Sequence, residues 1–460
     1  QSALRLLEEK EGDLQEKGRV LERLGDIKRL VGEYDASMKH WNEALLLWKQ
    51  LNEKGKVSRV HRKIAGVLWG VVGDVEKAKE HYDEALRILE AEPESFELAN
   101  LYVSIAYMYF RTGNMTKALS WAEKAVELAK KLNDFEVTAK SYSILGTVFM
   151  SIGEQKKAIE CFERALKIAL DNGYAMTALG VYNGLAISLP AGESQKRLEC
   201  FEKGFELAKK VGAIGSTSWI GTNLSMAYTA MGSMNKAVSL AEESVALDKK
   251  AGDMVNLSWS LNALGLAYQV LGEWDRSEQL YKEAITIAKR VNEFQQIAYG
   301  YGFLGLFSFV KGEYVKAKKS FEEMYGVLEK AGAKLISSLQ MYFALVNICS
   351  HIELGEIEKA SNLIDKTYEL ALQVKDKGLI ASADLLRAIQ LRAQKKWEES
   401  LEFFEKSLQE YEALDARRWN VYWFAMVLCE YARVYLERGQ EDDREKADKL
   451  LNQALEIFQK

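Results

Sequence analysis

The sequence predicts an all-α solenoid, in which antiparallel helix pairs are stacked in order along the chain. Two observations indicate this fold: a turn signal recurs about every 40 residues, and apolar residues lie at helical spacing on both sides of each turn. A third is that only 2 prolines occur in 460 residues, so helices can dominate the chain. A lone helix pair cannot bury both of its apolar stripes, which is why such units occur in series.

The stretch 261–289 shows the repeat unit clearly. In its first half, Leu261 and Leu264 lie at helical spacing, and the small residue Gly265 indicates the close approach of a neighbouring helix. Gly272 lies where this helix ends, and we expect it to adopt the left-handed backbone of a C-terminal cap. A second amphipathic helix follows directly.

The turn position recurs along the whole chain at steps of 39 to 44 residues. It is occupied by Gly32, Gly73, Gly113, Gly153, Gly192, Gly232, Gly272, Gly312, Gly355, Lys395 and Gly439. This spacing predicts about 11 repeats, preceded by a partial repeat of which residues 1–14 form the second helix. No Ser/Gly-rich linker or low-complexity tract interrupts the series, so we expect one continuous domain over residues 1–460.

Repeat five departs from the others in its turn and in the preceding helix. Pro190 and Gly192 stand in the turn, and Gly180 and Gly184 loosen the helix before it. We expect either a change in superhelical pitch at this point or a harmless irregular turn.

The two ends of the chain lead to a further expectation. Residues 2–7 align with the second helix of the next repeat, so the chain begins inside a repeat. The last repeat has no polar capping helix, and an uncapped repeat exposes apolar surface. We therefore expect more protein upstream of Gln1, and end-to-end or upstream-domain contacts through the terminal repeats.

The repeats carry a recognisable signature. An aromatic residue, a Leu-Gly pair and a second aromatic in the first helix are followed by Ala and Phe in the second, as in Tyr142, Leu145, Gly146, Phe149, Ala158 and Phe162. This pattern resembles that of the tetratricopeptide repeat family over essentially the whole chain. The units are about six residues longer than the usual 34 and lack the helix-ending proline. In this they are similar to the long repeats of regulatory ATPases and peptide-sensing regulators.

That resemblance implies a right-handed superhelix whose first helices line a concave groove, where ligands generally lie. Reading the positions around the Leu-Gly core predicts a groove lined by Tyr107, Phe110, Asn183, Trp219, Asn223, Trp259, Asn262, Tyr299, Phe303 and Tyr342. Four of the aromatic residues recur at steps of 40, 40 and 43 residues, and the asparagines recur at 40 and 39. We expect an aromatic row beside an amide row; the alternative is that these side chains merely pack between adjacent helices.

An extended peptide suits such a groove. A carboxamide offers one acceptor and two donors, enough to pair with a peptide unit whatever its side chain. Aromatic side chains supply a large contact area with little loss of rotamer freedom. A second, basic patch of Arg19, Arg23, Arg29 and Lys63 could hold an anionic ligand, unless Glu22 and Asp26 balance it as a solvated face.

Several motifs resemble cofactor-binding or metal-binding motifs but have structural explanations. Residues 300–305 form a literal G-x-G-x-x-G, but they lie inside a predicted helix and not in a strand-to-helix turn, so close helix packing explains them. His40 and His81 recur with the repeat, and no ligand spacing for a metal is present. No pairing of a nucleophile with a base is recognisable, so we expect no enzyme, no metal and no cofactor.

Composition and charge limit the partners and the cellular compartment that we expect for this chain. The net charge is −5, with both signs interspersed, which argues against a nucleic-acid surface. No apolar run reaches the length of a membrane span, and no secretory signal opens the chain. Cys161 and Cys200 occupy equivalent places in successive repeats, too far apart for a disulfide, so we expect reduced thiols in a cytoplasmic protein.

The sequence therefore predicts a scaffold that binds a protein or peptide segment in its groove. The alternative is that the chain is the C-terminal sensor arm of a larger signalling protein, such as a regulatory ATPase, which responds to a ligand or partner.

Overall fold

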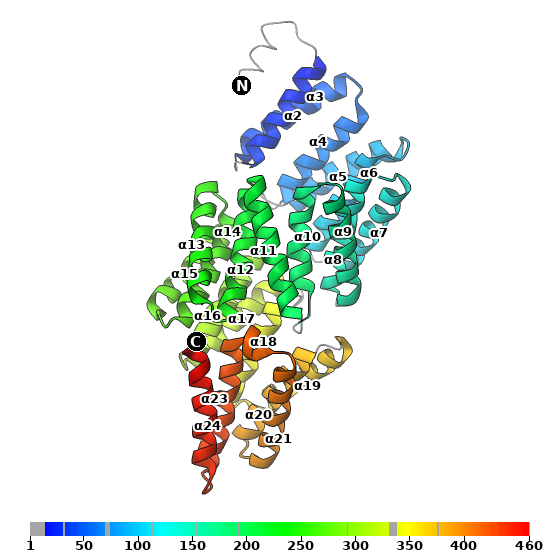
Figure 1. Cartoon of the computed structure of the whole chain (residues 1–460). Helices are drawn as coiled ribbons and strands as arrows, with labels where there is room; N and C mark the ends of the chain where they lie inside the picture. The colour runs from blue at the N-terminus through cyan, green and yellow to red at the C-terminus, as the bar shows by residue number, and fades with distance from the viewer. Residues whose placement is uncertain are drawn as a thin grey trace. The chain divides into compact units, whose positions relative to one another are not determined.

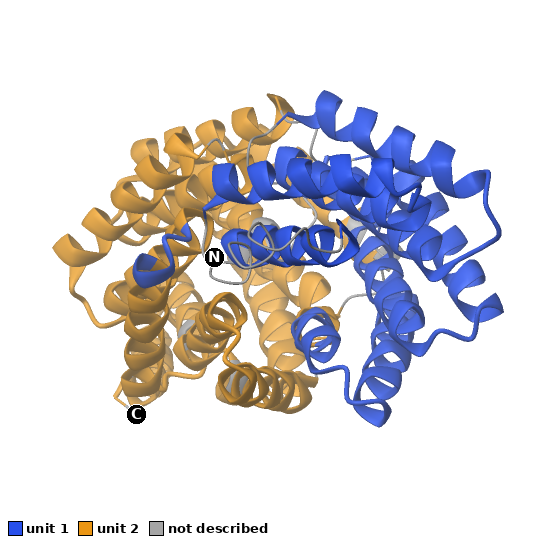
Figure 2. Cartoon of the chain, turned by 90° about the horizontal axis from the view of Figure 1, so that it is seen from above, with its two compact units in different colours: residues 1–185, 249–253 blue, residues 186–248, 254–460 orange. Residues whose placement is uncertain are grey.

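The computed structural model describes residues 14–30, 33–69, 74–112, 114–152, 154–190, 193–291, 293–330, 338–374 and 377–459. In these ranges the regular elements are helices, and no strand is present. The chain divides into two compact units, unit 1 with residues 1–185 and 249–253, and unit 2 with residues 186–248 and 254–460 (Figure 2). Whether the two units form one continuous domain stays a prediction.

Unit 1 is built from consecutive helix pairs (Figure 1). Its helices are α2 (Leu14–Leu30), α3 (Tyr34–Gln50), α4 (Lys54–Val67), α5 (Val75–Glu90), α6 (Phe96–Arg111), α7 (Met115–Lys131), α8 (Phe135–Ser151) and α9 (Gln155–Asp171). Each first helix packs on its own second helix, and α4, α6 and α8 also pack on one another in order. The helix after these, α10 (Ala175–Ser188), contains the boundary between the units, between Leu185 and Ala186.

Unit 2 continues the same design. Its helices are α11 (Ser194–Val211), α12 (Ile214–Ala230), α13 (Met234–Ala251), α14 (Met254–Val270), α15 (Trp274–Arg290), α16 (Phe294–Val310), α17 (Tyr314–Lys330), α18 (Ser338–Glu353), α19 (Ile357–Val374), α20 (Lys377–Ala393), α21 (Trp397–Ala413), α22 (Ala416–Trp419), α23 (Val421–Arg438) and α24 (Asp443–Phe458). First helices α12, α14, α16, α18 and α20 follow one another in contact. The predicted all-α solenoid of antiparallel helix pairs is confirmed.

The Leu-Gly position of the signature is where the two helices of a pair come closest. A methyl group added to Gly265 of α14 would lie 2.7 Å from the ring of Tyr281 in α15. Gly305 of α16 meets Phe321 of α17 at the same 2.7 Å. A side chain at these glycines would displace the aromatic ring of the second helix, which explains the small residue in the first.

A hydrogen bond often ties the same two helices together. Ser277 of α15 donates its hydroxyl to the carbonyl oxygen of Gly265 at 2.8 Å, and Ser400 of α21 does the same to Ala388 of α20 at 2.8 Å. In both cases the serine is fully buried, so the bond satisfies a hydroxyl that water cannot reach. A small polar residue therefore recurs inside an otherwise apolar helix contact.

Several turn positions adopt the left-handed backbone expected of them. Between paired helices of unit 2, φ is positive at Gly232, Gly272, Gly312, Gly355, Lys395 and Gly439. The predicted turns at Gly32, Gly73, Gly113, Gly153 and Gly192 lie outside the described residues, as do residues 1–13 of the predicted partial repeat. Lys395 is the one non-glycine in this set, at φ 60, so its backbone carries the strain that glycine avoids.

The G-x-G-x-x-G string lies inside α16, where close packing explains its glycines. Added methyl groups at Gly300 and Gly302 would lie 2.5 Å from Ile285 and 2.3 Å from Phe343, respectively. The ring of Phe343 fills the space beside Gly302. Among the described helices, none is long and apolar enough to cross a membrane.

Candidate functional site

The predicted aromatic row is continuous over three first helices of unit 2. Trp219 of α12 stacks on Trp259 of α14 with ring centroids 6.1 Å apart, and Trp259 meets Tyr299 of α16 at 4.9 Å. Trp219 and Tyr299 are half-buried, whereas Trp259 between them is only 7% exposed. The rings therefore pack on one another and keep part of their edges open to solvent.

The row ends at Tyr342 of α18, against a residue that sequence reasoning did not identify. The ring of Tyr342 lies edge-on to Trp423 of α23, with centroids 5.1 Å apart. Trp423 also donates its indole N–H to the hydroxyl of Tyr411 at 2.8 Å. The 40-residue periodicity could not have pointed to this contact, because α23 belongs to a repeat two places further along the chain.

Phe303 differs from its prediction as a groove residue. It has no exposed surface, and its ring stacks on Tyr281 with centroids 5.7 Å apart and meets Phe343 at 5.1 Å. The physical reason is that Gly302, its neighbour in α16, lets Phe343 approach closely enough to enclose it. Phe303 belongs to the core of unit 2.

The amide row is uneven. Asn223 of α12 is half-buried and accepts a hydrogen bond from the indole N–H of Trp259 at 3.2 Å, which joins the amide row to the aromatic row. Asn262 of α14 is fully buried, and neither atom of its carboxamide has a hydrogen-bond partner. Asn183 of α10 is half-buried and lies in unit 1. Within unit 2, Asn223 is thus the asparagine of the row that keeps exposed surface.

The predicted aromatic residues of unit 1 form a separate pair. Tyr107 and Phe110 of α6 stack with centroids 6.1 Å apart, and Tyr107 also meets Trp69 at 5.5 Å. Tyr107 is 42% exposed, the most open of the predicted aromatic residues.

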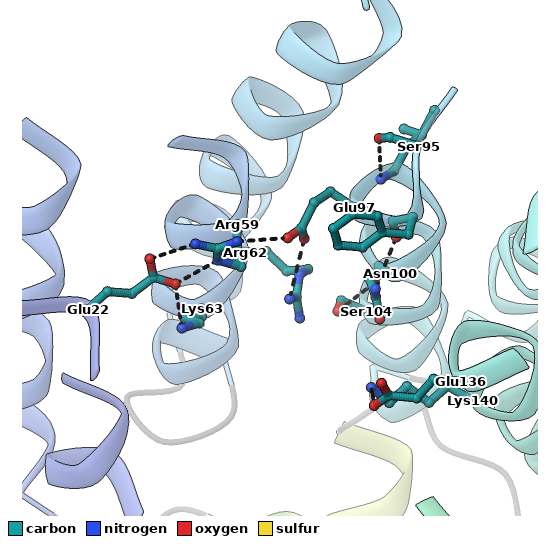
Figure 3. Close-up of polar contacts among 12 residues, drawn as sticks. Glu22, Arg59, Arg62, Lys63, Ser95, Glu97, Asn100, Ser104, Glu136 and Lys140 are labelled. Carbon is teal, nitrogen blue, oxygen red and sulfur yellow. Dashed lines mark hydrogen bonds and ion pairs between the residues drawn. The ribbon is translucent and has the colours of Figure 1, made fainter. Parts of the chain in front are cut away.

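The first helices of unit 1 also carry a charge ladder, Glu22–Arg59–Glu97, that sequence reasoning missed (Figure 3). Arg59 of α4 donates to Glu22 of α2 at 2.7 and 2.9 Å and to Glu97 of α6 at 3.1 Å. Both carboxylates are buried, at 5% and 7% exposure. The signal was present as charges of alternating sign separated by 37 and 38 residues.

The charges of Glu22 and Arg59 shift one another's pKa values. Burial on its own raises the pKa of Glu22, but hydrogen bonds and charge from Arg59 and Lys63 outweigh it and lower that pKa to about 2. The hydrogen bond to Glu22 raises the pKa of Arg59 further above its ordinary value. Glu22 and Arg59 are therefore both charged at neutral pH. The ladder links three successive first helices.

Comparison with known proteins decides the family. A sequence model of the tetratricopeptide repeat matches residues 16–91, 97–171 and 216–290. The chain is built from tetratricopeptide repeats. The matched segments contain the helix pairs from α2 to α9 and the pairs around Trp219 and Trp259 described above.

Relatives of this tetratricopeptide-repeat chain include regulators. It is 29% identical over 108 residues to a transcriptional activator, NprA, of Geobacillus stearothermophilus, covering 23% of this chain and 27% of that protein. It is 29% identical over 122 residues to response regulator aspartate phosphatase I of Bacillus subtilis, covering 26% of this chain and 30% of that protein. The matches thus span less than a third of each relative's length.

Solved structures share the fold at low identity. The Rap conjugation gene regulator of the plasmid pLS20, in complex with a Phr peptide, superposes with a TM-score of 0.52 at 15% identity, covering 68% of this chain and 95% of that chain. At this identity the likeness concerns the fold of the tetratricopeptide repeats alone.

The predicted basic patch on the first two repeats is largely balanced. Lys63 donates to Glu22 at 2.7 Å and to Asp26 at 2.8 Å, and Arg19 pairs with Glu16 at 3.3 Å. Arg23 and Arg29 are exposed. For Lys63 the observed arrangement is the alternative one, in which Glu22 and Asp26 balance the basic charge.

Two of the histidines form a close pair between α4 and α5. His61 of α4 and His81 of α5 face each other with their Nδ1 atoms 2.8 Å apart, so one ring donates and the other accepts. In the described ranges, no group of three or more His, Cys, Asp or Glu side chains is placed to hold a metal. Cys161 and Cys200 are buried, and neither forms a disulfide.

Proposed function

We propose that this tetratricopeptide-repeat chain binds an extended peptide or protein segment along the first helices of unit 2, without catalysing a reaction. The observation that carries the proposal is the joined pair of rows, in which Trp219, Trp259 and Tyr299 stack in series and Asn223 is hydrogen-bonded to Trp259. Peptide binding by the Rap conjugation gene regulator supports the proposal.

The two rows supply different contacts: the aromatic row supplies apolar contact area, and the amide row supplies hydrogen bonds. The exposed edges of Trp219 and Tyr299 supply rigid apolar contact area, to which a peptide side chain can add at low cost in rotamer entropy. The Asn223 carboxamide is half-buried and is oriented by the indole N–H of Trp259, and a carboxamide offers the same kinds of donor and acceptor as a peptide unit. Each such hydrogen bond contributes on the order of 1 kcal/mol net.

An alternative is the sensor arm of a larger signalling protein. It is supported by the two curated relatives, a transcriptional activator and a response regulator aspartate phosphatase, whose lengths extend well beyond the matched segments. In that case peptide binding would be coupled to an effector domain. A DNA-binding, phosphatase or nucleotide-binding domain encoded in the same chain, with an activity that changes on peptide binding, would favour this alternative.

The test first selects a peptide ligand and then measures how substitutions in the aromatic and amide rows change its affinity. The full chain is used to select binders from a random dodecapeptide display library, and the best peptide is measured by titration calorimetry. Trp219→Ala and Asn223→Ala should each weaken binding, by about tenfold or more for the tryptophan, because a buried aromatic anchor typically contributes about 2 kcal/mol. Trp274→Ala, at the start of second helix α15, is the matched control and should bind like the unchanged chain.

Asn262→Ala tests whether both asparagines of unit 2 contribute to peptide affinity. Because Asn262 is fully buried, its substitution should leave peptide affinity unchanged while Asn223→Ala reduces it. Equal affinity for Trp219→Ala, Asn223→Ala and the control would contradict binding along this row.

A further inference from the structure

A cleft in unit 2 lies between α23 and the first helices α16, α18 and α20. Two of the side chains that line it are carboxylates, Glu353 of α18 and Glu430 of α23. The others are apolar, among them Phe309 of α16, Ile389 of α20 and Trp423 of α23. The four helices contribute to one buried apolar cluster, so the cleft is a preformed feature of the fold.

The two carboxylates belong to a cluster of ion pairs in which acids outnumber bases. Its carboxylates are Glu353, Glu430 and Glu437, and its guanidinium groups are Arg392 of α20 and Arg433 of α23. Among the charged side chains that the structure describes in this cluster, three negative charges therefore face two positive ones. When all five groups are ionised, one negative charge is left without a matching cation.

The shortfall of positive charge falls on Glu430. Arg392 donates to Glu353 at 2.8 Å and to Glu437 at 2.7 Å. Arg433 donates to the same two carboxylates at 3.0 and 2.8 Å. The two guanidinium groups lie 3.6 and 3.8 Å from Glu430, whose Oε2 atom is buried without a hydrogen-bond partner. Burial raises the pKa of Glu430 by more than the two guanidinium charges lower it.

An ammonium group would supply what Glu430 lacks. It carries a positive charge and three N–H donors, so it can hydrogen-bond a carboxylate and leave the existing ion pairs in place. The rings of Trp423 and Phe309 line the same cleft, and aromatic faces attract cations. Ile389 and Val427 offer apolar surface to a hydrocarbon stem. A neutral or anionic group of the same size would leave the charge of Glu430 uncompensated.

We propose that this cleft is a binding site for a primary ammonium group on a short apolar stem, with Glu430 as its anionic partner and Trp423 and Phe309 as its aromatic walls. A small free amine and the lysine side chain of a bound segment share this chemistry. The proposal does not depend on peptide binding along the row of Trp219, Trp259 and Tyr299, so either proposal can fail without the other.

Binding is measured on the full chain by saturation-transfer NMR of the ligand, with n-propylammonium as the probe. A ligand of this size should bind with a Kd on the order of 1 mM, which suits this method. n-Propanol and propionate have the same length but a neutral or negative end, so they should give much weaker signals. Equal signals from all three compounds would show contact with apolar surface only and would overturn the proposal.

Glu430→Gln removes the charge and keeps the size of the side chain. It should weaken n-propylammonium binding about tenfold or more, because the buried anionic partner is lost. The fold should persist, as checked by circular dichroism, because the guanidinium groups hydrogen-bond Glu353 and Glu437 instead. Glu445→Gln is the matched control, since Glu445 is an exposed acid in the first turn of α24, and it should bind like the unchanged chain. Unchanged binding by Glu430→Gln, or an equal loss in both variants, would contradict the proposal.

Cys349 reports where the amine binds. It is a buried thiol that lines the cleft, whereas Cys200 of α11 is buried elsewhere in unit 2. At about three times its Kd, n-propylammonium should slow the alkylation of Cys349 by N-ethylmaleimide about fourfold and leave Cys200 unchanged. Equal protection of the two thiols would place the amine outside the cleft and overturn the assignment.

A second probe distinguishes the two sources of the ammonium group. Nα-acetyl-lysine N-methylamide carries the same group on a piece of peptide backbone. If a bound segment supplies the ammonium group, this probe should protect Cys349 at least as strongly as n-propylammonium does. If a free amine is the ligand, the added backbone should weaken the protection. Both results support an ammonium site, whereas no protection by either probe would exclude it.

Discussion

Gly302 and Gly326 are helical glycines of unit 2 in opposite surroundings. A methyl group on Gly302 would lie 2.3 Å from the ring of Phe343, whereas nothing lies within 4 Å of one on Gly326. The first glycine is required by packing, and the second only adds backbone freedom to the unfolded chain.

Substitution by alanine should therefore have opposite effects at these positions. Gly302→Ala should lower the free energy of unfolding by about 1–3 kcal/mol through overpacking. Gly326→Ala should raise it by about 0.5–1 kcal/mol, because alanine is the better helix former. Urea denaturation followed by circular dichroism measures both, and equal effects of the two substitutions would contradict the packing argument.

The facing pair His61 and His81 should make unit 1 sensitive to mild acid. Burial, together with the charges of His81 and Lys49 and against that of the Glu84 carboxylate, lowers the pKa of His61 to about 4. The unfolded chain, with a histidine pKa near 6.5, binds the proton first. Stability is therefore full above about pH 6.5 and is lost as pH falls toward about 4.

Urea denaturation between pH 7.5 and 4.5 measures this dependence. His61→Gln removes the titrating group, so its stability should fall less steeply over this range than that of the unchanged chain. His40→Gln keeps the His61–His81 pair and is the control. The same slope for His61→Gln and the unchanged chain would exclude His61 as the source.

At the scale of elements, contacts between first helices differ between the units. In unit 1 the ladder Glu22–Arg59–Glu97 joins α2, α4 and α6 by ion pairs, whereas in unit 2 the stacked rings of Trp219, Trp259 and Tyr299 join α12, α14 and α16. One repeat design thus supports a charged inner contact in one part of the chain and an aromatic one in another.

Removal of the central cation should destabilise unit 1 strongly. Arg59→Gln leaves the buried carboxylates of Glu22 and Glu97 with weaker partners, which should cost about 3 kcal/mol of unfolding free energy. Arg276→Gln breaks an exposed pair with Glu273, which water screens, and should lower the stability far less. Denaturant titration of both variants tests the contrast.

The ladder should also make the free energy of unfolding depend on pH in acid solution. Because the folded pKa of Glu22, about 2, lies below its ordinary 4.5, the ladder stabilises the fold above about pH 4.5 and loses that contribution as pH falls toward 2. Arg59→Gln should flatten this part of the stability curve. An unchanged acid limb would show that the ladder is not what acid disrupts.

At the scale of the whole molecule, the expectation of one continuous domain over residues 1–460 leads to a further prediction. The boundary between the units falls inside helix α10, between residues 185 and 186, so no linker separates the repeats there. If the solenoid unfolds as one domain, alkylation of Cys161 in unit 1 and Cys200 in unit 2 should show the same urea midpoint. Two separated midpoints would show that the units unfold independently.

Most of the fold was predictable from the sequence, because a tetratricopeptide repeat is specified by local features. Helical spacing, the small residue at Gly265, the left-handed turn at Gly272 and the packing of residues 300–305 inside a helix depend on neighbours within about 40 residues, and the structure bears them out. Periodicity also predicted which aromatic side chains of unit 2 would meet, since equivalent positions of successive repeats lie side by side.

Exposure and long-range contact required the tertiary structure. Phe303 lies two 40-residue repeats after the half-buried Asn223, yet it is fully enclosed, because burial depends on how closely neighbouring helices approach. The pairing of Lys63 with Glu22 and Asp26, and the contact of α23 with Tyr342 and Gly232, join helices separated by one to five repeats. Repetition in a sequence specifies each unit and its nearest neighbours, whereas the accumulated twist of many units decides which distant surfaces meet.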